Sequence, residues 1–385
     1  MPYHCECEQC QNKEFNYEDY IIKEEDFKVL DKERPLGISG HLRVKDEAMS
    51  IAECIDSCID ALDELIITYN KSTDNTEEIL KEYEKKYPDK IRLYYYEPNI
   101  IKYNENEYKT KYSSIHYLPN YYNFGYIKTK YKYYMKIDAD QIYFTEKFLE
   151  IREALLSNIN KTKNINKLLI IQRIAYLIPF KKLRNNFRTN FIKKIFNKEK
   201  NYNYNGTEDI LSFKDFIIYN KFLYKNKLSY ELGGIDLILN DNQLYCNTDF
   251  IFNGCVGDHF IFIPKSKNRY FMSNAGIEAI NTENNKCMLG FLWVHLGDLK
   301  RKKVLKNKDN IKILEISNLE WKDIFKYIQQ YDKDNVFMYN QHKNLGEKYF
   351  DIDKKYLTKE FYDKYLKKPL EYAIKHYGDN IERLW

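Results

Sequence analysis

The chain has 385 residues, of which 44% are hydrophobic and 16% aromatic, a composition far from that of a disordered protein. Its 62 basic and 57 acidic residues leave a net charge of +5, an excess too small to indicate nucleic acid as the main partner. No stretch approaches the roughly 18 uninterrupted apolar residues of a membrane-spanning helix, and the polar N-terminus lacks the apolar core of a secretory signal. We therefore expect a cytoplasmic protein whose cysteines are reduced.

The first 35 residues are highly charged and show little periodicity. Within them, four potential zinc ligands, His4, Cys5, Cys7 and Cys10, lie in a run of seven positions. Structural zinc sites usually place two pairs of ligands on separate turns, so a run this tight is poorly suited to surround one ion. The sequence favours a poorly ordered or peripheral lead-in over residues 1–35, with a zinc site as the alternative.

From residue 38 onward, apolar runs of strand length alternate with segments of helical periodicity. The second helix begins at a capping box, Asp74–Glu77, and the first buries Cys54 and Cys58 as small apolar residues. This order predicts an α/β fold with a doubly wound, mostly parallel sheet and right-handed crossovers. The expected strands are Ile38–Val44, Leu65–Tyr69, Ile91–Tyr96 and Tyr133–Ile137, and the expected helices cover 48–59, 74–87 and 121–130.

The pattern is weaker beyond residue 150. Apolar runs favour three further strands, at Leu168–Ile174, Phe260–Ile263 and Phe291–Leu296. From about residue 318 the chain is rich in Lys, Tyr and Phe at the spacing of short amphipathic helices. We expect the C-terminal region to be helical.

Two carboxylates, Asp138 and Asp140, directly follow the expected strand Tyr133–Ile137. In extended chain, residues two apart point to the same side, so both carboxylates can face one ligand. The carboxyl edge of a parallel sheet is where such folds bind ligands. Two close carboxylates repel each other unless a cation lies between them, and Mg²⁺ or Mn²⁺ accepts carboxylate oxygens while leaving positions open for a diphosphate. The pair therefore predicts a divalent metal site.

Two more polar turns follow expected strands at the same sheet edge. Asn70 to Thr76 follows the second strand, and Lys45 to Ala48 follows the first. Asp74 can be interpreted as a helix N-cap, or as an acceptor for the imide N–H of a uracil beside the positive end of the helix. Three turns from three strand ends are expected to converge on one crevice.

These three turns, Leu42–Ala48, Ser72–Thr76 and Tyr133–Asp140, resemble those of inverting family 2-like glycosyltransferases with the GT-A fold. They are most similar to bacterial lipo-oligosaccharide β-1,4-N-acetylgalactosaminyltransferases. The resemblance implies a UDP-sugar donor, with Asp74 on the uracil, Asp138 on the ribose or metal, and Asp140 on Mn²⁺ or Mg²⁺. Arg43, Glu47 and Asn70 lie in the same turns and are expected to contact the donor. Tyr69 stands where the family usually has Asp.

The acceptor side is less well defined by the sequence. An inverting transfer needs a base to take the proton of the attacking hydroxyl, and Asp258, in a glycine-containing segment, is the first candidate. A turn between strands is the alternative for that segment, and Asp236 and Asp249 are weaker candidates for the base. His295 lies in an apolar run, so it is either a hydrogen-bonded core residue or, as the resemblance implies, an additional metal ligand.

The resemblance also implies a division of the chain. We expect a charged lead-in (1–35), a nucleotide-sugar-binding half (36–150), an acceptor-binding and catalytic half (151–300) and a helical C-terminal region (301–385).

Residues 181–200 contain eight Lys or Arg and one Glu, with apolar side chains at four-residue spacing. This pattern predicts a basic amphipathic helix that can lie on an anionic membrane surface. A second basic run, Lys300–Lys303, would add to it. A solvated basic face on a helix packed against its own domain is the alternative. A lipid-linked, cell-surface glycan as acceptor would suit a peripheral membrane location.

The predicted function is transfer of a hexose or N-acetylhexosamine from a UDP-sugar to a glycan. A sugar nucleotidyltransferase would share the sheet and the metal, but it should carry a glycine-rich loop after the first strand, and Leu42 to Ala48 contains no glycine. A non-catalytic glycan- or nucleotide-binding protein would tolerate loss of the aspartate pair, which is present.

Overall fold

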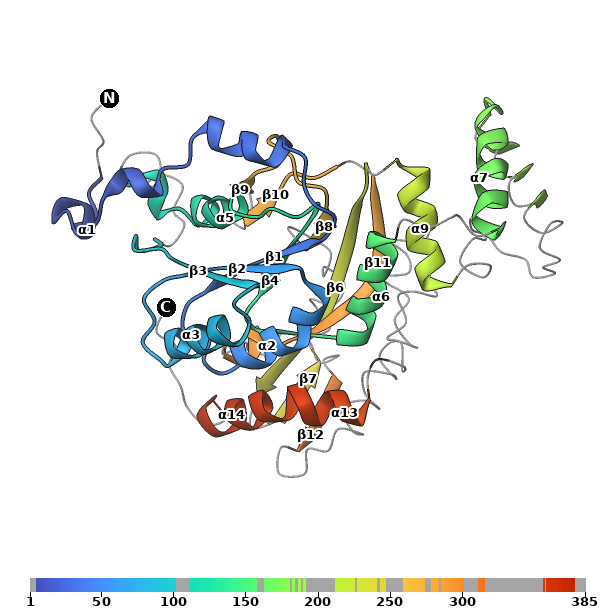
Figure 1. The fold of residues 1–385 in the computed structure, drawn as a ribbon. Helices are drawn as coiled ribbons and strands as arrows, with labels where there is room; N and C mark the ends of the chain where they lie inside the picture. The colour runs from blue at the N-terminus through green and yellow to red at the C-terminus, as the bar shows by residue number, and fades with distance from the viewer. Residues whose placement is uncertain are drawn as a thin grey trace.

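The protein is described here by a computed structural model. It covers residues 5–101, 111–157, 163–180, 212–225, 227–240, 243–246, 259–273, 278–283, 285–300, 311–315, 356 and 358–377, with isolated positions from 182 to 191. The described chain forms a mixed α/β fold around one large sheet, with a separate two-stranded hairpin (Figure 1).

One half of the large sheet is parallel, as predicted. The strand order is β4-β1-β2-β3, and each neighbouring pair runs parallel. Helices connect successive strands, which gives the doubly wound arrangement expected from the alternating sequence pattern. The strands are β1 (Ile38–Val44), β2 (Glu64–Tyr69), β3 (Ile91–Tyr95) and β4 (Tyr133–Asp138), and the connecting helices are α2 (Ile51–Cys58), α3 (Thr76–Lys86) and α5 (Leu118–Tyr126).

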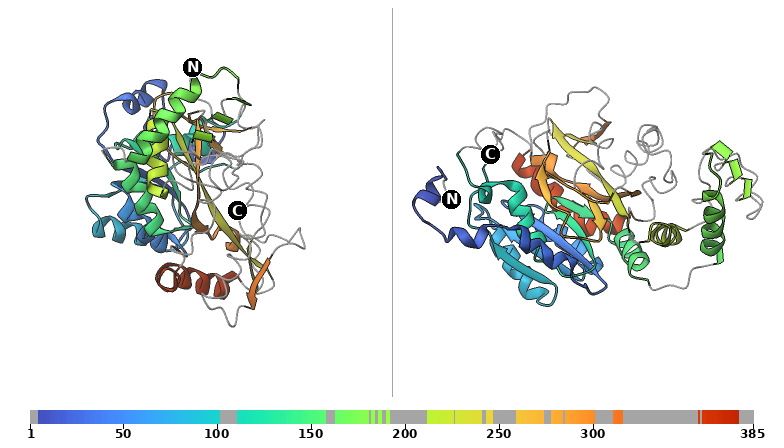
Figure 2. Two further views of the ribbon diagram at one scale, coloured as in Figure 1. Left: turned by 90° about the vertical axis from the view of Figure 1, so that its right-hand side faces the viewer. Right: turned by 90° about the horizontal axis from the view of Figure 1, so that it is seen from above.

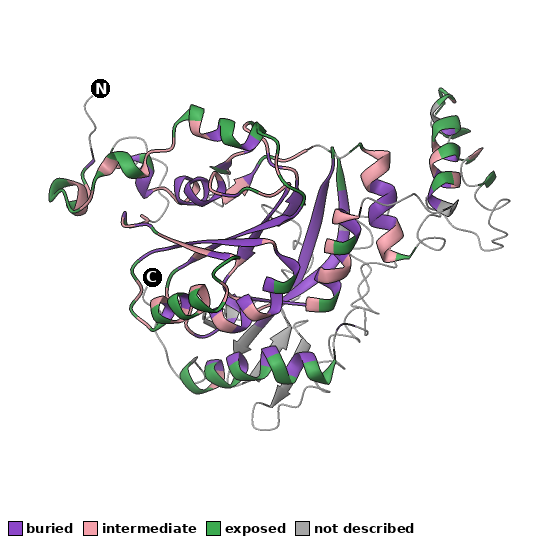
Figure 3. Ribbon diagram, viewed as in Figure 1, coloured by how far each residue is buried: buried purple, intermediate pink, exposed green. Residues whose placement is uncertain are grey.

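The helices cover both faces of this half. Figure 1 shows α5 on one side of the strands and α2 with α3 on the other. The central strands are buried almost throughout (Figure 3), which explains their nearly continuous apolar sequences. Cys54 and Cys58 are fully buried on α2, as predicted. Helix α5 begins at Leu118, three residues before its expected start, with a proline in its first turn.

The second half of the sheet is mixed. β8 (Phe260–Phe262) pairs antiparallel with β4 and also with the long strand β6 (Ser229–Asn240). β11 (Lys286–His295) pairs parallel with β6 and antiparallel with β5 (Gln141–Tyr143). The strands expected near 260 and 291 are thereby confirmed. This pairing brings the end of β11 beside the residues that follow β4.

The remaining elements lie around this sheet (Figures 1 and 2). Strands β7 and β12 extend it beyond β6, and β9 with β10 forms the hairpin. The described C-terminal helices pack near α2. No helix in the described part of the chain has both the length and the apolar character needed to cross a bilayer. These elements are α6 (Thr145–Leu156), α7 (Lys163–Tyr176), α9 (Phe213–Leu223), β7 (Gln243–Cys246), β9 (Tyr270–Met272), β10 (Glu278–Ile280), the 3-10 turns η3 (Ile59–Ala61), η4 (Ser114–His116) and η5 (Gly297–Lys300), β12 (Ile311–Glu315), α13 (Lys359–Phe361), the π-helical turn η8 (Tyr362–Leu366) and α14 (Lys367–Tyr377).

The strand expected at Leu168–Ile174 is wrong, because this segment is part of helix α7. The buried residues of α7 are Ile165, Leu168, Ile171 and Ala175. Their spacing of three or four residues is that of a helix face. The apolar run at 168–171 looked strand-like because it fills consecutive positions, including the exposed Ile170.

The expectation of a poorly ordered lead-in is wrong for residues 5–35. This segment forms three short helical turns, α1 (Glu8–Gln11), η1 (Tyr17–Tyr20) and η2 (Glu24–Asp31). Phe27 and Leu30 are buried in a cluster with α5, β4 and β8. The few apolar residues of the lead-in are thus enough to anchor it, although they have no regular period.

One buried histidine makes the stability of this core depend on pH. His41 on β1 is fully buried, its ring within hydrogen-bonding distance of Tyr134 (3.1 Å) and Thr68 (3.3 Å). Burial, assisted by nearby Lys136 and Arg43, lowers the pKa of His41 from 6.5 to about 3. Between these two values the unfolded chain binds a proton that the folded chain does not, so stability is lost as the pH falls.

We expect His41→Asn to remove this part of the pH dependence, which has a slope of up to about 1.4 kcal/mol per pH unit. Urea unfolding across the acidic range measures it. His376→Asn, at an exposed position of α14, should keep the wild-type slope. An unchanged slope in His41→Asn would contradict the assignment.

Candidate active site

The carboxyl ends of the four parallel strands meet at one edge of the sheet. From β1 the chain continues to β2 on one side, whereas β4 returns on the other side. The β1/β4 boundary is therefore the point at which the winding reverses, and open α/β sheets bind ligands at such a point. In the register of these two strands, Arg43 is the partner of Asp138. The sheet topology thus places the predicted aspartate at the expected ligand crevice.

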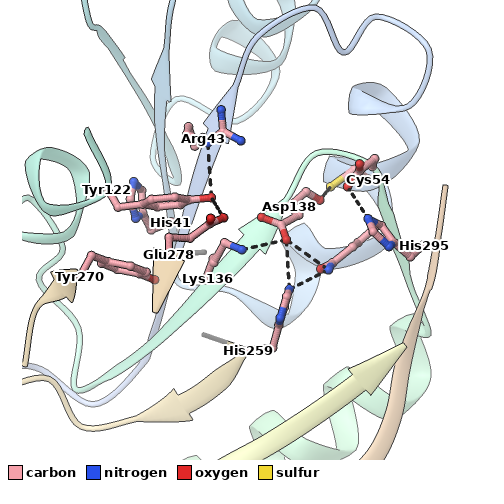
Figure 4. Close-up of polar contacts among 12 residues, drawn as sticks. His41, Arg43, Cys54, Tyr122, Lys136, Asp138, His259, Tyr270, Glu278 and His295 are labelled. Carbon is pink, nitrogen blue, oxygen red and sulfur yellow. Dashed lines mark hydrogen bonds and ion pairs between the residues drawn. The ribbon is translucent and has the colours of Figure 1, made fainter. Parts of the chain in front are cut away.

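Asp138 is the centre of a polar cluster (Figure 4). Its Oδ2 accepts hydrogen bonds from Lys136 Nζ at 2.9 Å and Gln141 Nε2 at 3.3 Å, and it lies 3.0 Å from His259 Nε2. Lys136 precedes Asp138 by two strand positions, so both side chains are on one face of β4. His259 comes from the start of β8, and its ring lies against Trp293 of β11. Residues from three strands therefore meet at one carboxylate.

The charge of Asp138 is well compensated. Burial by itself would raise the pKa of this carboxyl, but Lys136 and His259 hold the pKa well below its usual range. The ammonium group of Lys136 is itself buried, so removing the Asp138 carboxylate would leave this buried charge less well compensated. Asp138 is thus ionised, with a positive group already beside it.

Asp140 belongs to a second cluster. Its Oδ1 lies 3.2 Å from His295 Nε2, and the Nδ1 of the same ring lies 2.5 Å from Asp236 Oδ1. Burial would lower the pKa of His295, but the two flanking carboxylates raise it well above the ordinary value. Asp236 of β6 and Gln141 of β5 are the strand partners of His295. The sheet therefore sets the position of this histidine, which the sequence left as either core or ligand.

This second cluster fits a divalent cation. Asp140 offers a carboxylate oxygen, and Nε2 of His295 faces it. Asp236 holds the other ring nitrogen, as the carboxylates behind metal-binding histidines commonly do. Gly297 lies against the pair, and a Cβ there would come within 2.5 Å of Asp140 Oδ2 and 2.8 Å of His295 Nε2. The backbone needs a glycine at this position to leave the two side chains room.

Asp138 does not belong to this second cluster. Among described residues, the group of three or more His, Cys, Asp or Glu whose ligand atoms all lie within 4.8 Å of one another is Cys5, Cys7, Cys10 and His116, and neither Asp138 nor the pair of Asp140 and His295 belongs to it. Its carboxylate is turned to Lys136, Gln141 and His259. Of the three predicted metal ligands, the structure brings Asp140 and His295 together and gives Asp138 other partners.

The two turns after β1 and β2 are joined by reciprocal hydrogen bonds. Asp46 accepts from the backbone N–H and the hydroxyl of Thr73, at 2.6 and 3.0 Å. Asp74 accepts from the N–H of Ala48 at 3.1 Å and of Thr76 at 3.0 Å. Asp46 has a positive φ of 54°, a conformation that Asp tolerates better than most residues. The convergence of these turns is confirmed, and their carboxylates hold it in place.

The expected capping box at Asp74–Glu77 takes a different form. Helix α3 has Asn75 as its N-cap residue, without a side-chain cap hydrogen bond. Asp74 instead binds the N–H two residues ahead while tying down Ala48. The Asp74 carboxylate is therefore shared between its own turn and the turn after β1. The sequence around Asp74 cannot indicate this second partner.

The other expected donor contacts have structural partners of their own. Asn70 is buried and donates to the backbone oxygens of Tyr96 (2.7 Å) and Pro98 (3.2 Å). The backbone N–H of Glu47 donates to the hydroxyl of Thr76 at 2.8 Å. Arg43 donates to the hydroxyl of Tyr122 at 3.3 Å and lies over the same ring, as Figure 4 shows. These residues therefore shape the crevice whether or not they contact a ligand.

Asp258, the expected base, and Asp249 lie outside the described residues, as does most of the basic segment 181–200. The structure adds two groups that the sequence interpretation missed, Lys136 and His259. Lys136 could have been found by extending the two-residue spacing of Asp138 and Asp140 one step back. His259 directly follows Asp258 in the segment singled out for the base, but only the pairing of β8 with β4 shows which aspartate it faces.

Residues 12–152 match the family model described as beta-1,4-N-acetylgalactosaminyltransferase (CgtA). The matched segment contains all three turns and the first four parallel strands. The resemblance seen in the sequence is therefore confirmed over this part of the chain, which is related to a family of glycosyltransferases. A search of the curated proteins gives no match.

Several solved structures are similar to parts of the chain. Glucosyl-3-phosphoglycerate synthase from Mycobacterium tuberculosis, in complex with Mn²⁺, UDP-glucose and phosphoglyceric acid, is 18% identical, with 41% of this chain and 55% of that chain covered and a TM-score of 0.24. TarS from S. aureus is 15% identical, with 31% and 20% covered and a TM-score of 0.21. The chain thus spans about half or less of the length of these proteins. The GT-A-like form of the sheet, with its parallel half β4-β1-β2-β3 and a mixed second half, follows from its own topology.

We expect Asp236→Asn to lower the affinity for Mn²⁺ about 10- to 100-fold, because it removes the charge that orients and polarises His295. Titration of the protein with Mn²⁺ in the presence of UDP measures this directly, without an assay of turnover. Asp89→Asn, at an exposed position near α3, is the matched control. Equal Mn²⁺ affinity in the two variants would show that Asp236 has no part in metal binding.

Proposed function

We propose that the protein is a metal-dependent glycosyltransferase that moves a hexose or N-acetylhexosamine from a UDP-sugar to a glycan, with inversion at the transferred carbon. The name of the matching family favours N-acetylgalactosamine as the sugar. The observation that carries the proposal is the placement of Asp138 and Asp140 at the carboxyl end of β4, beside the strand where the sheet reverses its winding.

The metal would be held by Asp140 and His295, with Asp236 behind the histidine. A bound Mn²⁺ or Mg²⁺ would neutralise the charge that develops on the departing nucleoside diphosphate. The direct contact between Asp140 and His295 supports these two residues as the protein ligands of the metal. Asp138, kept ionised by Lys136 and His259, is suited to accept hydrogen bonds from the ribose or from a water on the metal.

The donor would lie across the ends of β1, β2 and β4. Arg43 and Lys136 contribute positive charge close to Asp138, which suits an anionic diphosphate. The Asp74 carboxylate already accepts two backbone hydrogen bonds and a third from the hydroxyl of Thr76, and an ionised carboxylate has about four acceptor positions, so one position remains. A uracil imide can therefore be added without breaking the link between the turns. Glu47 and Asn70 belong to the turns after β1 and β2.

The base would be Asp258, taking the proton from the acceptor hydroxyl. It directly precedes His259 in the sequence, and His259 contacts Asp138. Asp236 is less suited to this role, because its carboxylate is held by His295. The turn after β1, Leu42 to Ala48, contains no glycine, which weighs against nucleotidyl transfer.

A screen of nucleotide sugars for donor hydrolysis, with and without Mn²⁺, tests the donor, the metal and the activity together. We expect UDP-sugar hydrolysis only with the metal, and a loss of about 100-fold or more in Asp140→Asn. Asp89→Asn should retain wild-type turnover, and the two variants should unfold at similar temperatures. Wild-type turnover in Asp140→Asn, or in the presence of excess chelator, would refute the mechanism.

We also propose that the acceptor is lipid-linked and that the protein contacts an anionic membrane surface through the region from α7 to residue 200. The described part of this region exposes large apolar side chains. The side chain of Leu177 is 82% exposed and that of Phe180 68%, and Ile170, Leu183 and Phe191 are also exposed. In Figure 1 and the right-hand view of Figure 2, α7 lies at the periphery beyond α9. Exposed apolar residues next to basic ones are typical of an interfacial segment.

Replacement of Leu177, Phe180 and Leu183 by Ser should release the protein from vesicles that contain anionic lipid, because each loses apolar burial in the bilayer interface. Vesicle sedimentation measures the bound fraction. The matched control replaces three apolar residues exposed elsewhere, Val29, Leu36 and Phe271. Failure of the unmodified protein to bind would favour a merely solvated basic face.

A further inference from the structure

The N-terminal cysteines form a cluster with a histidine distant in the sequence. The ligand atoms of Cys5, Cys7, Cys10 and His116 all lie within 4.8 Å of one another. His116 Nε2 is 3.0 Å from Cys7 Sγ and 3.2 Å from Cys10 Sγ. Within the described part of the chain, no other set of three or more His, Cys, Asp or Glu brings its ligand atoms this close together. His4, which the sequence suggested as the fourth ligand, lies outside the described residues.

The cluster has the dimensions of a tetrahedral zinc site. With Zn–S near 2.3 Å and Zn–N near 2.0 Å, ligand atoms around one zinc ion lie roughly 3.5–3.8 Å apart. The distances from His116 Nε2 are slightly below this range, and the upper limit of 4.8 Å is slightly above it. Small side-chain rotations would bring all four ligand atoms to the required separations.

The backbone around the cysteines holds the cluster together. Cys7 is the N-cap of α1, and its sulfur accepts a hydrogen bond from the backbone N–H of Cys10. The helical turn thus places the two sulfurs on one side. Cys5 Sγ in turn accepts from the N–H of Ser113, the residue directly before η4. Three thiols in six positions can therefore surround one ion, because the turn folds them together and the histidine closes the fourth side.

His116 is oriented as a metal ligand would need to be. It is fully buried, and its Nδ1 lies 2.7 Å from the backbone oxygen of Asn99. A backbone oxygen can only accept, so Nδ1 carries the proton and Nε2 presents its lone pair to the sulfurs. An N–H donated to a backbone carbonyl is the usual support behind a metal-binding imidazole.

Backbone and amide hydrogen bonds bring the two segments together independently of any ion. Glu6 N–H donates to Lys111 O at 2.8 Å, and Asn99 N–H donates to Gln9 Oε1 at 2.8 Å. The N-terminal segment is thereby docked on the chain that follows β3. This docking brings His116 to the three cysteines, so the fourth ligand comes from a separate segment rather than from the cysteine run itself.

We propose that Cys5, Cys7, Cys10 and His116 bind one structural Zn²⁺ ion. Thiolate and imidazole ligands select zinc over the hard cations that suit the aspartate site. Four protein ligands leave no open position, which indicates a structural rather than a catalytic ion. Binding releases the thiol protons to solvent as the thiolates form. The ion would fasten residues 5–12 to the segment between β3 and α5, at a place separate from the transfer chemistry.

The test uses the full chain, purified reduced and without chelator, with zinc measured by inductively coupled plasma mass spectrometry. We expect about one zinc per chain, falling to below about a tenth in Cys7→Ser and in His116→Ala. Cys58→Ser, which removes a buried thiol on α2, is the matched control and should keep its zinc. Asp140→Asn should keep it as well, because that variant alters the other site.

Cobalt substitution provides a second readout that needs no variant. Co²⁺ bound to the unmodified protein should show the intense visible bands of tetrahedral coordination and a thiolate charge-transfer band, both displaced by zinc. Zinc-free protein that also fails to bind Co²⁺ would overturn the proposal. So would zinc retained in both Cys7→Ser and His116→Ala, or a disulfide between two of the three cysteines in the reduced preparation.

Discussion

Two carboxylates at the end of β4, Asp138 and Asp140, have their negative charges balanced by positively charged side chains, and much of the architecture depends on these pairs. The side chains of Asp138 and Asp140 are partly buried, 22% and 14% exposed, and two carboxylates at one sheet edge repel each other unless positive groups lie beside them. Asp138 obtains one from its own strand, Lys136, and another from β8, His259. Asp140 obtains His295 from β11. The second half of the sheet therefore supplies the groups that let the first half hold its charges.

This arrangement joins the two halves of the protein at the site itself. β6 and β11 run side by side, so that Asp236 is the strand partner of His295. β5 continues from the aspartate pair and pairs with β11 in the opposite direction. The polar chain from Asp140 through His295 to Asp236 thus crosses three strands. Displacement of any of them would separate a donor from its acceptor, so the fold and the site are coupled.

A similar coupling holds the donor side together. The turns after β1 and β2 exchange hydrogen bonds through Asp46 and Asp74, and buried Asn70 ties the second turn to the chain after β3. Side chains that would be assigned to ligand contacts from their position alone are also structural elements of the crevice. Loss of one of them would alter ligand affinity and loop geometry together.

The sequence by itself determined the parallel half of the fold. The strands at 38–44, 64–69, 91–95 and 133–138 follow from apolar runs that alternate with helical periodicity, and Asp138 with Asp140 follows from their two-residue spacing. These patterns are local, because each one repeats within a single helix or strand. The segment at 168–174 shows the limit, because a continuous apolar run does not distinguish a strand from a helix with one exposed side.

Only the tertiary structure decided which distant residues complete each cluster. His259 is more than a hundred residues from Asp138, and His295 is more than a hundred from Asp140; His116 is as far from Cys7. No period or spacing in the chain encodes these pairings. They arise because strand order and the docking of the N-terminal segment bring remote positions together, and charge compensation and hydrogen bonding act through space rather than along the sequence.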